Sequence, residues 1–110
     1  MFKADLKRGS MELLILSVLE TRARHGYDIG KSLERCSGGK LEFRVSTLYS
    51  VLYRMEERGW IKGRWVERPG ERRRCRYSLT AAGKRALGQQ REEWRSFVDT
   101  VNLVVNGETG

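Results

Sequence analysis

Proline, cysteine and histidine are scarce in this 110-residue sequence, which has one proline, two cysteines and one histidine. With Pro69 as its only proline, the chain has little of the composition that long irregular linkers show. Cys36 and Cys75 lie far apart and neither has a neighbouring cysteine or histidine, so the spacing indicates neither a zinc site nor a disulfide framework. Free thiols of this kind are typical of the reducing cytoplasm, where we expect this protein. His25 lacks the partners that a metal ligand or a general base requires.

Signatures of enzymes and of membrane-spanning proteins are also missing. The sequence has no catalytic pair of carboxylates, no nucleophile elbow and no glycine-rich phosphate loop, because its glycines are scattered. A chain of this length buries only about two-thirds of its unfolded surface, which leaves little room for a deep cleft. The apolar run at residues 13–19 is too short to span a bilayer. We therefore expect no enzymatic activity, no cofactor, no metal and no membrane partner.

Positive charge is what the sequence has in excess, and it is concentrated. The net charge is +8, and residues 64–76 contain six arginines and two glutamates, which is half of that excess. Such a cluster suggests contact with nucleic acid, an anionic membrane surface or an acidic protein, and the plain alternative is a solvated hairpin. Arginine outnumbers lysine here, which favours nucleic acid, because guanidinium groups suit bidentate contacts with phosphates and base edges.

The first half of the chain has the periodicity of three helices. The first helix is expected behind Ser10 as N-cap, with apolar residues three and four apart at Met11, Leu14, Ile15, Val18 and Leu19. Leu13 and Leu16 lie off this stripe and suggest that a second protomer covers the helix. Ile29, Leu33 and Cys36 mark a second, shorter helix, which is expected to end at residues 37–39.

The third helix is expected to begin near Ser46 as N-cap and to stop at Gly59. Its buried side would hold Leu48, Val51, Leu52 and Met55. At its start and on its opposite face lie hydrogen-bonding side chains that suit a groove of DNA: Ser46, Thr47, Tyr49, Ser50, Tyr53 and Arg54. The alternative reading of the tyrosines is that they are half-buried packing residues.

Residues 60–67 and 72–79 each alternate in the manner of a strand, and Pro69 with Gly70 forms the turn between them. The alternation predicts that Ile61, Trp65, Cys75, Tyr77 and Leu79 face inward. It predicts that Arg72, Arg74 and Arg76 face outward, with Arg68 and Arg73 near the tip. Three helices followed by a basic hairpin predict a winged helix-turn-helix, a mainly α fold in which the third helix enters the major groove of DNA while the wing reaches backbone or minor groove.

A long amphipathic helix is expected from Thr80, as N-cap, to Asn106 and Gly107. Its apolar residues are Leu87, Trp94, Phe97, Val98, Val101, Val104 and Val105. This stripe is longer than a small winged domain needs, so we expect a homodimer, and the alternative is a helix that folds back on its own domain. The expected division is a DNA-binding domain at residues 1–79, a dimerisation helix at residues 80–106 and a flexible tail at residues 107–110.

Three motifs, in this order and spacing, resemble the PadR-like family of transcriptional regulators, especially its short members with a single C-terminal helix. They are HGYDI at residues 25–29, TLYSVLYRMEERGWI at residues 47–61 and ERRRCRYSLTAAGKRAL at residues 71–87. The resemblance implies a bacterial dimeric DNA-binding protein, usually a repressor. It also implies a structural role for His25, with Tyr27 a phosphate or core contact. Many family members have Pro-Gly and Pro where this chain has Val45, Ser46 and Ser50, which bears on the operator sequence.

These observations predict a sequence-specific regulator, a repressor that binds a pseudo-palindromic operator as a homodimer. The alternative is a non-specific polyanion-binding or protein-interaction module that uses the same basic wing. Some family members use paired tryptophans to sandwich flat aromatic effectors. Trp94 would correspond to that arrangement, or it is ordinary interface core. The expected partners are double-stranded DNA, a second copy of the chain and, under the first reading of Trp94, a small planar aromatic effector.

Overall fold

The computed structural model describes the backbone of residues 4–107 and the side chains of residues 10–107. Its elements follow the order of a winged helix-turn-helix: α1 (Ala4–Thr21), β1 (Arg24–His25), α2 (Gly26–Cys36), α3 (Val45–Glu57), β2 (Ile61–Val66), β3 (Arg74–Leu79) and α4 (Ala81–Val105). The mainly α fold with a small hairpin is therefore confirmed. Of the tail expected at residues 107–110, only Gly107 is among the described residues, and it belongs to the turn that ends α4.

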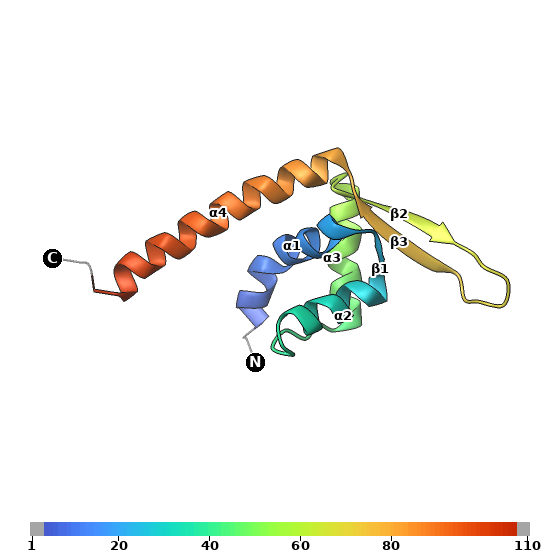
Figure 1. Ribbon diagram of the computed structural model, residues 1–110, viewed down its shortest axis with the longest axis horizontal. Helices are drawn as coiled ribbons and strands as arrows, with labels where there is room; N and C mark the ends of the chain where they lie inside the picture. The colour runs from blue at the N-terminus through green and yellow to red at the C-terminus, as the bar shows by residue number, and fades with distance from the viewer. Residues whose placement is uncertain (1–3, 108–110) are drawn as a thin grey trace.

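The three strands form one antiparallel sheet in the order β1-β3-β2. In the hairpin, Ile61 pairs with Leu79 and Trp65 with Cys75, so the register agrees with the inward and outward sets expected from alternation. On the other side of β3, His25 pairs with Arg76. The short strand β1 was not expected, because two residues show no periodicity. Figure 1 shows the hairpin extending away from the helices as a wing.

The hydrophobic core lies where α1, α2 and α3 meet the base of the sheet. It contains the four residues expected from α3 and, from the sheet, Ile61 and Tyr77. Leu16 is 0% exposed and Leu87 is 2% exposed within the single chain. The prediction that Leu16 and Leu87 lie at a dimer interface is therefore wrong, because neither has surface left for a partner to cover. Both residues stabilise the fold of one chain instead.

Two helices begin earlier than their expected N-caps. α1 begins at Ala4, so Ser10 lies inside the helix. Gly9 does not interrupt it, since a glycine costs a helix only about 1 kcal/mol, which the packing of the following turns offsets. α3 begins at Val45, because the amide of Leu48 donates to the carbonyl of Arg44 and closes the first turn before Ser46 can act as a cap.

Two apolar residues on the predicted apolar sides of their elements are exposed. Cys36 is the last residue of α2 and lies at the surface. Trp65 is 57% exposed, although it shares a face of the hairpin with buried Ile61 and Tyr77. The physical reason is the same in both cases: the periodicity gives the correct side of the element, but the core ends before the element does.

α4 starts as expected and then leaves the domain. Thr80 is its N-cap, with Oγ1 accepting a hydrogen bond from the amide of Gly83 at 3.0 Å. Arg91 holds the middle of the helix to α1 through a two-pronged ion pair with Glu20, at 2.8 and 3.0 Å. The far end of the helix projects past α1, as Figure 1 shows, and the molecule has extents of 66 × 30 × 21 Å.

Candidate nucleic-acid interface

The outward face of α3 is polar and accessible. Ser46, Thr47, Ser50, Tyr53 and Arg54 are all exposed, as the sequence predicted. Tyr53 is 65% exposed, so its hydroxyl is free to meet a partner. Hydroxyl and guanidinium groups on one helix face match the donors and acceptors that base edges display in the major groove. The face is therefore chemically suited to reading DNA.

Tyr49 differs from the other tyrosine on this helix. It is 41% exposed, and a Cβ added to Gly26 would lie only 2.4 Å from its hydroxyl oxygen. The ring therefore covers the first residue of α2, where only a glycine leaves room for it. The packing alternative holds for half of this side chain, and Tyr49 fixes α2 against α3 while keeping one edge at the surface.

The angle between α3 and the wing is fixed by a small cluster of polar groups. Oε2 of Glu56, in the last turn of α3, accepts a hydrogen bond from the amide of Gly63 in β2 at 3.2 Å. A Cβ on Gly63 would lie 2.8 Å from Sγ of Cys75 and 3.1 Å from that Oε2, so the close approach requires glycine. Burial raises the pKa of Tyr77 beside this cluster, and a hydrogen bond with Cys75 adds to the effect. The hydroxyl of Tyr77 is therefore neutral and packs as part of the joint.

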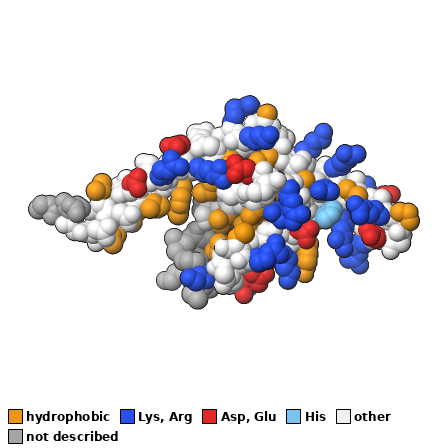
Figure 2. All heavy atoms as spheres, viewed as in Figure 1, with side chains coloured by type: hydrophobic (Ala, Val, Ile, Leu, Met, Phe, Trp, Pro, Cys, Tyr) orange, Lys and Arg blue, Asp and Glu red, His pale blue; other side chains and the backbone are white. Residues whose placement is uncertain are grey.

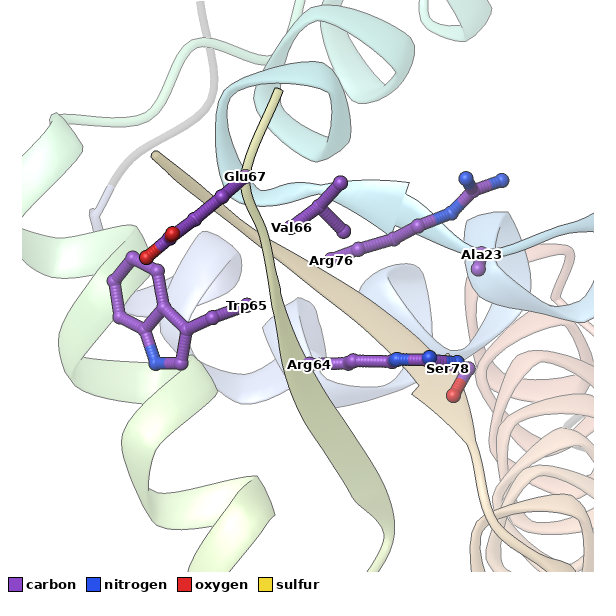
Figure 3. Close-up of a pocket in the computed structure, with 7 residues that line it drawn as sticks. All are labelled: Ala23, Arg64, Trp65, Val66, Glu67, Arg76 and Ser78. Atoms are coloured by element: carbon purple, nitrogen blue, oxygen red, sulfur yellow. The ribbon is translucent and has the colours of Figure 1, made fainter. Parts of the chain in front are cut away.

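The wing has two faces of different character. Gly63, Cys75 and Tyr77 point toward α3, as their contacts with Glu56 and with each other show. Because side chains alternate along a strand, Lys62, Arg64, Arg74 and Arg76 point the other way and form what we call the outer face. Figure 3 shows Trp65 and Arg64 projecting to opposite sides of the hairpin.

Arg73 is held on the face of the wing that points toward α3. Its guanidinium stacks over the ring of Trp65, with 4.5 Å between the guanidinium carbon and the ring centroid. Its Nε also lies 3.1 Å from a carboxylate oxygen of Glu67. The exposed ring of Trp65 therefore contacts Arg73. Among the described residues, Arg73 is the one arginine at the wing tip whose side chain is held by such contacts.

The other wing arginines have no carboxylate within ion-pair distance among the residues whose side chains are described. These are Arg64, Arg68, Arg72, Arg74 and Arg76, all exposed. Figure 2 shows Lys and Arg side chains gathered over the wing. Arg64 and Lys62 add to the basic residues that the sequence predicted at the interface. Both could have been found from the sequence, because they alternate along β2 with the residues that were expected to face inward. A concentration of unpaired guanidinium groups attracts a polyanion.

The second accessible surface is apolar and lies on the projecting part of α4. Trp94, Phe97, Val101, Val104 and Val105 are exposed, Val98 is half-buried, and Leu103 adds an exposed apolar residue that was not predicted. The rings of Trp94 and Phe97 are 6.1 Å apart and line, with half-buried Leu13 of α1, a hollow of about 260 Å³. Figure 2 shows hydrophobic side chains along this arm.

Two further observations bear on partners. Tyr27 is exposed, with the ammonium of Lys31 5.5 Å from its ring centroid, so it is a surface residue and not a core contact. Among residues 4–107, no helix combines the length and the hydropathy that crossing a membrane requires.

Solved structures share this fold, and the first two described below also match the length of this chain. A transcriptional regulator from Clostridium thermocellum superposes with a TM-score of 0.85 at 31% identity, covering 93% of this chain and 96% of that one. A PadR family transcriptional regulator from Eggerthella lenta gives 0.83 at 28% identity, covering 94% and 88%. Bacillus subtilis PadR, solved in complex with operator DNA, gives 0.66 at 25% identity, covering 73% of this chain and 45% of that one.

The family model described as "Transcriptional regulator PadR-like family" matches residues 15–89, which include α2, α3, both strands of the wing and the start of α4. These are the elements that carry the polar α3 face and the basic wing. Together with the regulators of the same fold, the match shows that this chain belongs to the PadR-like family of transcriptional regulators.

Proposed function

We propose that the protein is a repressor that binds a pseudo-palindromic operator as a homodimer. The observation that carries this proposal is the polar, exposed face of α3 standing beside a wing whose arginines lack carboxylate partners among the described residues. The helix face supplies donors and acceptors for base edges, and the wing supplies cations for phosphates. The operator DNA held by Bacillus subtilis PadR supports duplex DNA as the partner.

The dimer part of the proposal rests on α4. The helix has 25 residues and is about 37 Å long, and apolar residues from Trp94 to Val105 are exposed along its second half. The residues Trp94, Phe97, Val101 and Val104 are spaced three and four apart, which is the spacing of a seam between two helices. A second copy of the same helix would cover this seam. The chain would then divide at residue 80 into a DNA-binding domain and a dimerisation helix. Two-fold symmetry would then place two α3 helices on one side of the duplex.

A comparison of recognition-face and wing variants tests the DNA part. Tyr53→Phe and Arg54→Ala should lower the preference for the operator over random duplex DNA, because base contacts specify the sequence. Arg72→Ala and Arg74→Ala should weaken specific and random sites alike. Each should also reduce the log–log salt slope by about 0.9 for each phosphate that the protein no longer neutralises. Both sets of residues lie at the surface, so each variant should fold. Thermal unfolding of each variant checks this.

The alternative function predicts a different pattern. A non-specific polyanion-binding module needs the basic wing but not the α3 face. If Tyr53→Phe and Arg54→Ala leave the preference for operator over random DNA unchanged, the recognition role of α3 is wrong and the alternative stands.

An effector site beside Trp94 is the finer part of the proposal. Trp94 and Phe97 border a hollow between α1 and α4, and a planar aromatic ligand stacked there would change how the two DNA-binding heads are spaced. Titration with planar dyes and phenolic acids, followed by tryptophan fluorescence, tests it against Trp94→Phe, which keeps the signals of Trp60 and Trp65. Saturable quenching that disappears in the variant supports the site. Quenching that is unchanged or absent means that Trp94 is interface core only.

A further inference from the structure

One side of α2 carries a row of side chains that a glycine interrupts. Tyr27, Gly30, Lys31 and Glu34 are spaced three and four apart, so they lie along the same side of the helix. A Cβ on Gly30 would lie 3.3 Å from Cδ2 of Leu48, which is buried in α3. The row therefore has a gap at Gly30, and Leu48 closes the bottom of this gap.

A hollow of about 410 Å³ lies at this gap, between α2, the loop that follows it and α3. Each of these segments contributes one aromatic ring to the lining, namely Tyr27, Phe43 and Tyr49. The volume falls in the range of about 300–1,000 Å³ that is typical of sites for small molecules. The hollow shares no residue with the one beside Trp94, so the two are separate.

Negative charge exceeds positive charge in the lining of this hollow, although the chain as a whole carries +8. The charged side chains that line it are the carboxylates of Glu34 and Glu42 and the ammonium of Lys31. Glu34 is half-buried and forms no ion pair with any described side chain. The hollow therefore favours a cation over an anion.

The ring of Tyr27 already has a cation in front of it. Nζ of Lys31 lies 5.5 Å from the ring centroid, which is within the distance of about 6 Å at which an aromatic face attracts a cation. Lys31 forms no ion pair with Glu34, although the two residues are three apart on the same side of α2. The lysine thus shows where a positive charge is stable in this hollow and leaves the carboxylate of Glu34 for another cation.

We propose that the hollow between α2 and α3 binds a quaternary ammonium compound, whose cation replaces the ammonium of Lys31 over the ring of Tyr27 and faces the carboxylate of Glu34. A quaternary ammonium has no N–H group, so aromatic faces and one carboxylate are sufficient for it, whereas a primary ammonium has three donors to satisfy. Its methyl groups would gain apolar contact with Phe43 and Leu48.

Titration of the full chain with choline, followed by the NMR shifts of backbone amides, tests the site. We expect saturable shifts concentrated at residues 27–34 and 42–49. Glu34→Gln and Tyr27→Leu should each weaken choline binding by about threefold or more, because each removes one of the two attractions on the cation. Glu57→Gln is the matched control, because it removes the same charge from an exposed position of α3 outside the hollow. It should change the affinity by less than about 1.5-fold, since exposed charges at a distance are screened.

Removing Lys31 should have the opposite effect. Lys31→Met should tighten choline binding by about threefold, because the cation that competes for the ring of Tyr27 is gone. Lys62→Met removes the same charge from the wing and should leave the affinity unchanged. The proposal is overturned if the two lysine variants behave alike, or if choline does not bind. It is also overturned if dimethylbutanol, the neutral analogue with carbon in place of nitrogen, binds as well as choline. Trp94→Phe should bind choline like the unchanged chain, and loss of binding in it would reject this site in favour of the hollow beside Trp94.

The effect of the compound on DNA binding rests on the proposed function. Val45 and Tyr49 line the hollow and belong to the first turns of α3, which would stand in the major groove. Choline chloride should therefore lower operator affinity more than sodium chloride at the same ionic strength, and operator should lower choline affinity by the same factor. Equal effects of the two salts would overturn this coupling. A chain that binds choline through Glu34 and Tyr27 but binds no operator rejects the proposed function and leaves the site standing.

Discussion

Gly83 and Gly88 lie in the same helix, but only Gly83 has a backbone neighbour where a side chain would be. A Cβ on Gly83 would lie 2.0 Å from the carbonyl oxygen of Trp60, whereas a Cβ on Gly88 meets open space. Gly83→Ala should therefore lower the free energy of unfolding by about 3 kcal/mol, because the carbonyl belongs to the turn that the Thr80 cap also holds.

Gly88→Ala is the matched control for this substitution. It should raise the free energy of unfolding by about 0.5–1 kcal/mol, since alanine in an exposed helix interior loses less backbone entropy than glycine. Urea unfolding at one fixed protein concentration measures both. Equal effects of the two substitutions would show that α4 does not dock on the Trp60 turn.

Tyr77 gives the protein a pH dependence on the alkaline side. Burial, with a smaller contribution from Cys75 and the nearby carboxylate of Glu56, raises the pKa of Tyr77 above that of a free tyrosine. In the unfolded chain the hydroxyl loses its proton near pH 10, whereas in the folded chain it keeps it. The stability that depends on the neutral hydroxyl is thus present below about pH 10 and decreases as the pH rises above that value.

Tyr77→Phe separates this residue from the other groups that titrate in the same range. The variant should lose less stability between pH 9 and pH 11 than the unchanged chain, with slopes bounded by about 1.4 kcal/mol per pH unit for one proton. Unfolding in urea across that pH range measures the difference. Parallel curves for the two proteins would contradict the burial of Tyr77.

At the scale of elements, the hydrogen bond between Glu56 and the amide of Gly63 joins α3 to the wing. Glu56→Ala should reduce operator affinity about tenfold, because the two DNA-binding elements lose a fixed mutual angle while each keeps its own contacts. Glu56→Gln should largely restore operator affinity, since an amide oxygen still accepts the bond. Fluorescence anisotropy with labelled operator measures the affinity of each variant.

Glu57→Ala controls for the loss of a carboxylate near DNA. Glu57 is exposed at the end of α3, and no contact of its side chain is seen among the described residues. Removing it should raise affinity for all DNA slightly, because it removes repulsion of phosphates. If Glu56→Ala behaves like Glu57→Ala, Glu56 acts through its charge and does not position the wing.

The elements that the sequence predicted are those whose period repeats over several turns or residues. The buried side of α3 and the alternation of the hairpin are of this kind. The strand β1 was missed, because Arg24 and His25 become a strand only once β3 is beside them. Trp65 was placed on the correct side but not in the correct environment, since alternation does not say how far along a strand the core extends.

The same limit applies to the candidate site. Sequence pattern identified the exposed polar residues of α3 and the arginines of the wing, because exposure follows from period. It did not show that Tyr49 rests on Gly26 or that Arg73 rests on Trp65, because each contact joins residues from different elements. The hollow between α2 and α3 is likewise visible only once the two helices are packed together.

For the whole molecule, the exposed seam on α4 predicts a dimer. Val101→Asp places a charge at the centre of this seam and should give a monomer at micromolar concentration, because a buried unpaired charge costs several kcal/mol. Asn102→Asp is the matched control, since it adds the same charge to the next residue, off the seam. Sedimentation equilibrium should show twice the monomer mass for the unchanged chain and for Asn102→Asp. A monomeric unchanged chain would reject the dimer.

Selection of bound sites from random duplex DNA tests the central claim most directly. A two-fold dimer with one α3 helix in each of two successive major grooves predicts enriched sites made of two inverted half-sites, with centres about 10 base pairs apart. Each half-site should be read mainly through the exposed face of α3, so the selected sequence should change with Arg54→Ala. A pool that shows no enriched sequence after repeated rounds, or a single unpaired half-site, would contradict operator binding by a dimer.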